Sequence, residues 1–255
     1  REQFGKPIIE FPAVFEMLTN MKAKLQASRA MLYETTRFVQ LYKTYTHISH
    51  KRKLEAEERA EMKAYTRLAD AFTPLLKLMS SEYCNQLAYD ALQIHGGSGY
   101  MHDYPIQRIY RDARITNIYE GTSQLQVVAA IRHVTTGTYL SQIMEYEKAE
   151  CPGDLDQIRK RLVAMREEYE KTVEKVVSTG DNEVIDFHAR RMVEMAGHII
   201  LSHLLLRQAA EVEEYRTSAI VYSKYGQAQN RAAAEYIAHS CCGDIDLFKQ
   251  VLDEH

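Results

Sequence analysis

The sequence predicts an all-α protein, an up-and-down helical bundle followed by a second helical bundle-like domain. Apolar residues recur at spacings of three and four along most of the chain, which is the period of an amphipathic helix. Between Ala13 and His95 there is one proline and no glycine, so little interrupts this pattern. No segment carries a convincing strand pattern.

Two long helices are predicted in the first half of the chain. The first runs from about Pro12 to about Thr46, and the second from about Ala64 to about Ile94. The charge-rich stretch from His50 to Met62 between them suits a solvated loop or a frayed helix end. Pro74 lies within the second helix and predicts a kink or a restart there.

Shorter helices are predicted further on. One covers Ile106 to about Ala113, and another runs to about Thr136 with Thr122 as its N-cap, which places Glu120 in the turn before it. A second helical unit opens at Pro152-Gly153. Its helical patterns cover about 155–176, 183–215 and 218–239. We therefore predict one domain over residues 1–139 and a second over residues 140–255.

Composition excludes several classes of partner. The 255 residues carry a formal charge of −3 with mixed signs, which gives no electrostatic case for binding nucleic acid or an anionic membrane surface. No apolar run approaches the roughly 20 residues that span a bilayer. Of the four cysteines, Cys241 and Cys242 are adjacent, a pattern that resembles neither a disulfide framework nor paired zinc knuckles. A reducing compartment is expected.

A glycine cluster, Gln93-Ile94-His95-Gly96-Gly97-Ser98-Gly99-Tyr100, joins two helical stretches. No other glycine lies between Gly5 and Gly96, so the cluster predicts a close approach of the backbone to a ligand. Gln93 could instead cap the preceding helix. His95 and His102 flank the turn without thiolate or carboxylate support, and no metal site is expected.

Two charged features further along have alternative interpretations. Glu120 precedes a helix, where a carboxylate ordinarily favours the helix dipole, but its neighbours Ile118, Tyr119 and Gly121 are uncharged, as a desolvated base requires. The cluster Arg111-Asp112-Ala113-Arg114 is interpreted as a set of ion pairs that fixes the turn, rather than as a substrate contact.

Four motifs together resemble one known family. REQFGKPI (residues 1–8), QIHGGSGY (93–100), YRDARI (110–115) and IYEGTSQLQ (118–126) occur in this order and at similar spacing in the C-terminal helical domain of acyl-CoA dehydrogenases. The agreement of four separated motifs makes the resemblance specific, and it covers about Arg1 to Gly137. Residues from about Leu140 onward resemble the additional C-terminal helical domain of a longer subgroup.

The resemblance implies an FAD-dependent oxidation of acyl-CoA to trans-2-enoyl-CoA. Glu120 matches the family's base, which removes the α proton while hydride passes from the β carbon to flavin N5. Such a base works best where an apolar, water-excluded site raises its pKa. The backbone N–H of this glutamate would donate to the thioester carbonyl oxygen. Tyr119 and Gly121 match substrate-binding positions, and Gly121 leaves room for a substrate chain.

The resemblance also implies a flavin site. The matching residues are Arg1 and Gln3, which hold FAD from a neighbouring subunit, Phe4 beside them, Gln93, Gly96 and Gly97 against the adenosine half, and Thr122 and Gln124 at the nucleotide. Because family members share one FAD between two subunits, a homo-oligomer (dimer or tetramer) is expected. An electron-transfer flavoprotein or a similar acceptor is the implied redox partner.

The family's amino-terminal helical domain and middle β domain have no counterpart in this sequence. The chain is therefore expected to be the C-terminal portion of a longer enzyme and to be inactive alone. Residues 140–255 could cover the catalytic domain, form a subunit contact or take the place of a second dimer. The alternative function is a non-catalytic helical interaction or oligomerisation module. A bacterial cytoplasm is the expected location, with a mitochondrial matrix as the alternative.

Overall fold

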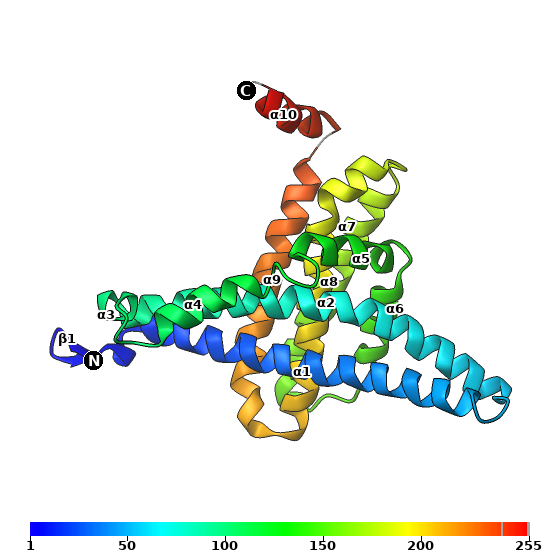
Figure 1. Cartoon of the computed structure of the whole chain (residues 1–255), viewed down its shortest axis with the longest axis horizontal. Helices are drawn as coiled ribbons and strands as arrows, with labels where there is room; N and C mark the ends of the chain where they lie inside the picture. The colour runs from blue at the N-terminus through cyan, green and yellow to red at the C-terminus, as the bar shows by residue number, and fades with distance from the viewer. Residues whose placement is uncertain (241, 254–255) are drawn as a thin grey trace.

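The computed structural model describes residues 1–240 and 242–253, so Cys241 lies outside the described residues. This part of the chain is almost wholly helical, which confirms the all-α prediction (Figure 1). The first five helices are α1 (Pro12–Ser49), α2 (Ala56–His95), α3 (Gly97–Tyr100), α4 (Ile106–Ile115) and α5 (Ser123–Thr135). They are followed by α6 (Thr138–Glu147), α7 (Asp156–Val177), α8 (Asn182–Glu211), α9 (Arg216–His239) and α10 (Cys242–Asp253). Short 3-10 turns cover Ile8–Glu10, Gly153–Leu155 and Glu213–Tyr215.

The helices form two groups that cross each other. α1 and α2 pack side by side as a long hairpin, while α7, α8 and α9 pack together and run across it (Figure 1). The connection between α1 and α2 is short, which favours antiparallel neighbours. α4 lies along α2, and α5 packs against both α2 and α8. None of the described helices is long and apolar enough to cross a membrane.

α8 is the central helix. Every residue from Met192 to Leu206 is buried except Glu194. A helix that is buried around its whole circumference must have neighbours on all sides. α8 accordingly contacts α1, α2, α5, α6, α7 and α9.

One continuous core contains buried side chains from both predicted domains. Met79 of α2 and Gly197 of α8 pack so closely that a Cβ on Gly197 would lie 2.9 Å from the Met79 sulfur. Tyr139, at the predicted boundary, is fully buried and stacks edge-on against Phe72. The division after residue 139 stays a prediction, but the two segments share their hydrophobic interior.

The absence of strands was a wrong prediction at the N-terminus. β1 (Glu2–Gln3) and β2 (Lys6–Pro7) pair antiparallel, with Glu2 opposite Pro7. Phe4 and Gly5, the two residues between the strands, both have positive φ, +50° and +77°. Such a two-residue turn matches the right-handed twist of paired strands. Phenylalanine rarely adopts positive φ, so the sequence carried no ordinary turn signal.

α2 differs from its prediction at two places. It begins at Ala56, inside the stretch expected to be a loop or frayed end, because Glu55 and Glu58 form a reciprocal capping box. It also continues through Pro74 without a restart. The buried Tyr139 hydroxyl donates to the Ala71 carbonyl oxygen over 2.6 Å, in the turn that Pro74 disturbs.

Two buried tyrosines link the helix groups. Tyr83 of α2 and Tyr222 of α9 share a hydrogen bond with an oxygen–oxygen distance of 2.7 Å. Burial raises the pKa of both phenols, so both stay neutral. Tyr169 of α7 is also buried, but its hydroxyl has no hydrogen-bond partner among the described residues.

We predict that Tyr222→Phe lowers the free energy of unfolding by about 1–3 kcal/mol, because it leaves the Tyr83 hydroxyl buried without a partner. Tyr169→Phe is the matched control and should cost almost nothing, since its hydroxyl makes no hydrogen bond. Urea denaturation measures both. Equal losses of unfolding free energy in the two variants would show that the Tyr83–Tyr222 hydrogen bond does not stabilise the fold.

Candidate functional site

The segment that carries Glu120 lies between α4 and α5, as predicted. Glu120 and Gly121 both have positive φ, +51° and +93°. Thr122 is the N-cap of α5, and its hydroxyl accepts a 3.3 Å hydrogen bond from the Leu125 N–H, which confirms the predicted cap. The Gln126 side chain donates to the Gly121 carbonyl oxygen over 3.1 Å. The first turn of α5 therefore holds the chain that precedes it.

Glu120 is exposed in this chain, and so are Ile118 and Tyr119 before it. Two apolar side chains of α5, Leu125 and Val128, are exposed as well. The expected desolvation of Glu120 is therefore not supplied by this chain alone, because no element of the described part covers the loop. The uncharged neighbours instead form an apolar surface around an exposed carboxylate.

Side chains of α2 hold the other end of this loop. The Lys77 ammonium donates to the Thr116 carbonyl oxygen over 2.7 Å and lies 4.9 Å from the centre of the Tyr119 ring. The Asn85 amide donates to the Ala113 carbonyl oxygen over 3.0 Å. These contacts fix the end of α4 and the beginning of the loop against α2.

The sequence interpretation missed the role of these α2 residues. Lys77 and Asn85 are eight positions apart, so they lie on the same side of the helix. Polar residues at this helical spacing were the available signal. Periodicity alone could not show which segment they would contact.

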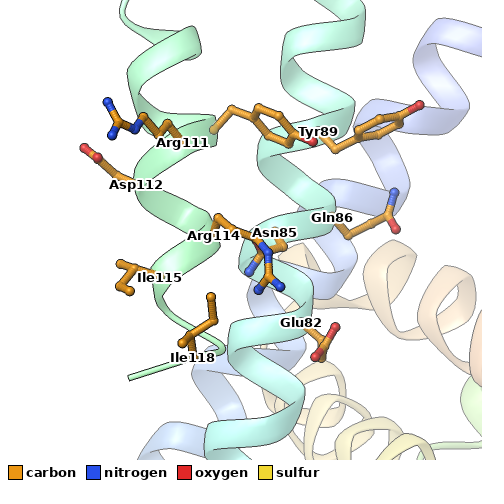
Figure 2. A pocket seen from close by; sticks show the side chains of 10 residues that line it. Glu82, Asn85, Gln86, Tyr89, Arg111, Asp112, Arg114, Ile115 and Ile118 are labelled. Carbon is orange, nitrogen blue, oxygen red and sulfur yellow. The ribbon is translucent and has the colours of Figure 1, made fainter. Parts of the chain in front are cut away.

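A groove of about 840 Å³ lies between α2 and α4 (Figure 2). Its walls combine aromatic rings, isoleucines and charged side chains. The lining residues are Glu82, Asn85, Gln86, Tyr89, Tyr110, Arg111, Asp112, Arg114, Ile115 and Ile118. Glu120 is not among them, although Ile118 brings one end of the groove to the start of its loop.

The predicted ion-pair cluster at Arg111, Asp112 and Arg114 is wrong. None of the three makes an ion pair within the part of the chain that the structure describes. Figure 2 shows both Arg111 and Asp112 on the outer side of α4, away from α2, but adjacent helical positions do not face each other, and no ion pair joins the two. Arg114 instead donates to the side-chain oxygen of Asn117.

The glycine turn lies at the end of α2. Gly96 is the C-cap, with φ +64° and ψ −150°. The guanidinium of Arg1 donates to the His95 carbonyl oxygen over 3.1 Å. A Cβ on Gly96 would lie 2.8 Å from a nitrogen of the same guanidinium. Gln93 does not cap the helix through its side chain; its carbonyl oxygen accepts from the Gly96 N–H. The fold thus brings Arg1 onto the predicted ligand turn.

The predicted site residues fall into two groups. Arg1, Gln3, Phe4, Gln93, Gly96 and Gly97 lie near the start of α3, whereas Tyr119, Glu120, Gly121, Thr122 and Gln124 lie beyond the end of α4. α4, whose ten residues span about 15 Å, lies between the two groups in the chain. Phe4 is 94% exposed. The roles of all eleven residues in binding or catalysis stay predictions.

We predict that Gly96→Ala lowers the free energy of unfolding by about 1–3 kcal/mol, because its backbone region is open only to glycine. The added methyl would also meet the Arg1 guanidinium. Gly97→Ala is the matched control, since a Cβ there meets nothing within 4 Å and its φ is not positive. Chemical denaturation compares them, and equal stability would contradict a strained turn at Gly96.

Comparison with curated proteins gives matches over about half of the chain. The chain is 32% identical over 138 residues to an acyl-CoA dehydrogenase of Bacillus subtilis, covering 54% of this chain and 30% of that protein. It is 36% identical over 126 residues to the caffeyl-CoA reductase-Etf complex subunit CarC of Acetobacterium woodii, covering 49% of this chain and 27% of that protein. The match thus spans less than a third of the length of these relatives.

Solved structures share the fold over the whole chain. The acyl-CoA dehydrogenase complexed with FAD from Bacillus anthracis has a TM-score of 0.68 at 21% identity, covering 99% of this chain and 47% of that one. The acyl-CoA oxidase3 of Yarrowia lipolytica has a TM-score of 0.70 at 14% identity, covering 100% of this chain and 42% of that one. At such identities the likeness concerns the fold.

The family comparison covers nearly the whole chain. Residues 135–245 match the family described as "Acyl-CoA dehydrogenase C terminal". Residues 1–135, more than half of the 255, match the family described as "Acyl-CoA dehydrogenase, C-terminal domain". The helical architecture agrees with both matches. The chain belongs to the acyl-CoA dehydrogenase family and matches the C-terminal domains of that family.

Proposed function

We propose that this chain is part of an FAD-dependent acyl-CoA dehydrogenase that oxidises acyl-CoA to trans-2-enoyl-CoA, with Glu120 as the base. One observation carries the assignment: Glu120 is an exposed carboxylate in a left-handed backbone conformation, surrounded by exposed apolar side chains. Strained backbone of this kind is concentrated at functional sites. Covering this surface with the rest of the enzyme would exclude water from the carboxylate.

In this proposal Glu120 does two things. Its carboxylate removes the α proton of the thioester while a hydride leaves the β carbon, so that two C–H bonds break and the C=C bond forms. Its backbone N–H, which makes no backbone hydrogen bond within the described residues, donates to the thioester carbonyl oxygen and stabilises the charge that develops there. Tyr119 and Gly121 line the substrate beside it.

FAD, when bound, supplies the acceptor for the hydride. The residues proposed to hold it are chemically suited: Arg1 offers a guanidinium for a pyrophosphate, and the exposed Gln93 and Gln124 offer amides. The first N–H groups of α5 beside Thr122 favour an anion. These residues enclose no cavity by themselves, so the proposal requires other domains and a second subunit to complete the site.

The proposal includes partners. Residues from two subunits would share each FAD, which makes the enzyme a homo-oligomer. The Acetobacterium woodii relative is named as a subunit of an Etf complex, and we propose an electron-transfer flavoprotein as the acceptor here as well. A bacterial cytoplasm is the proposed location, since both curated relatives described above are bacterial.

The alternative is a helical interaction module without chemistry. The exposed apolar residues of α4 and α5, among them Ile109, Ile115, Leu125 and Val128, favour a contact surface of some kind. The two functions differ in one measurable property. A module would bind no stoichiometric FAD even when the complete protein is reconstituted with it.

We predict that Glu120→Gln in the full-length protein retains FAD but lowers the rate of acyl-CoA oxidation by roughly 10²–10⁴-fold, because an amide cannot accept the α proton. Anaerobic bleaching of the flavin absorbance by acyl-CoA measures the reaction. The control is Glu145→Gln, which removes an exposed carboxylate paired with Lys148 and should leave the rate unchanged. Undiminished bleaching in Glu120→Gln would refute the assignment.

A further inference from the structure

The backbone around Glu120 requires support. Glu120 has φ +51°, and Gly121 follows it at +93°. A side chain other than glycine is disfavoured in this region, and the conformation persists only where surrounding contacts over-determine it. The Glu120 side chain itself makes no hydrogen bond or ion pair in the described part of the chain. Its position must therefore be set through the flanking residues.

Glu82 of α2 joins the two ends of the loop. Its Oε1 atom accepts a hydrogen bond from the Ser123 hydroxyl, and the Asn117 amide donates to the same oxygen over 3.4 Å. Asn117 and Ser123 stand three residues before and three residues after Glu120. The Ser123 N–H also donates to the Asn117 carbonyl oxygen over 3.1 Å, which joins the two ends of the loop. We call this pair of residues, Asn117 and Ser123, the neck of the loop. Glu82 thus holds the neck from which Glu120 projects.

Glu82 is in turn fixed by α8. The Arg190 guanidinium lies 3.4 Å from the same Oε1 atom of Glu82. Arg190 also donates through its Nε to Glu194, over 2.8 Å. Bonds of this charged kind are stronger and more directional than neutral ones. Glu194 therefore orients Arg190, and Arg190 holds Glu82.

Glu194 is the one residue between Met192 and Leu206 that is not buried. Its side chain is half-buried, and this partial loss of solvent raises the pKa of its carboxyl, against the attraction of Arg190. A carboxylate that is costly to place at this point of the central helix needs a partner, and Arg190 is that partner. The orientation of Arg190 is therefore tied to the position of α8 in the core.

We propose that Glu82 is a positioning residue for the base and that Arg190, held by Glu194, transmits the position of the C-terminal helices to the Glu120 loop. The catalytic part of this inference rests on the proposed function, whereas the part on loop order does not. Under this proposal residues 140–255 contribute to the site, because Arg190 of α8 fixes the neck of the Glu120 loop.

The first test is backbone hydrogen exchange of the purified protein, followed by mass spectrometry. Arg190→Gln should raise the exchange rate of the amides of residues 117–123 by about threefold to tenfold, because the neck opens more often. Arg190→Lys keeps the charge and should restore most of the protection. The control is Arg159→Gln, which removes an exposed arginine paired with Asp156 on α7 and should leave the loop unchanged.

Exchange in α1 separates a local effect from general destabilisation. A rise confined to residues 117–123 supports the proposal. Unchanged exchange in the loop, or an equal rise throughout α1, would overturn it. Glu82→Gln provides a second variant that keeps the size of the side chain and an acceptor oxygen, and it should produce the same local change.

The second test uses the complete enzyme. Glu82→Gln should lower kcat for acyl-CoA oxidation by about tenfold while KM and bound FAD stay within about twofold, as expected when only the reacting geometry is disturbed. A looser loop with unchanged kcat would overturn the positioning role. If the unaltered complete enzyme oxidises no acyl-CoA, the proposed function fails, and hydrogen exchange still decides whether Arg190 and Glu82 order the loop.

Discussion

The burial of α8 on all sides is the constraint on which the rest of the structure depends. Because nearly every residue between Met192 and Leu206 is buried, α8 must be enclosed by its neighbours in sequence, α7 and α9, and by the α1–α2 hairpin. That enclosure sets the crossing of the two helix groups (Figure 1). It also fixes α2 and α5, the helices that contact both ends of the Glu120 loop, against one common element.

The proposed site lies outside this buried core, and residues of α2 and α8 hold it in place. α2 supplies Lys77, Glu82 and Asn85 to the end of α4 and to the loop, and α8 supplies Arg190. The loop itself presents its carboxylate and apolar side chains outward. A rigid helix that positions an exposed loop is a common way to combine a fixed reacting group with access for a ligand. In the proposed function this loop is one side of the site, and other parts of the enzyme cover it.

Local patterns predicted most of the helices well. The apolar spacing placed α1, α4 and α5 within a few residues, and the N-cap at Thr122 followed from a single side chain. The errors have physical causes. The N-terminal hairpin uses positive φ at Phe4, and the start of α2 depends on a reciprocal Glu55–Glu58 cap. Arg111 and Asp112 form no ion pair because adjacent helical positions do not face each other.

The sequence by itself determined the helical class, the turn that holds Glu120 and the family, because these depend on periodicity, capping and motifs that are local in the chain. Only the tertiary structure decided that Arg1 lies on the Gly96 turn and that the two predicted domains share one core. It alone joined Glu82 to Asn117, Ser123 and Arg190. These contacts link residues 35 to 108 positions apart, and the packing of the helices on one another, rather than any local pattern, brings them together.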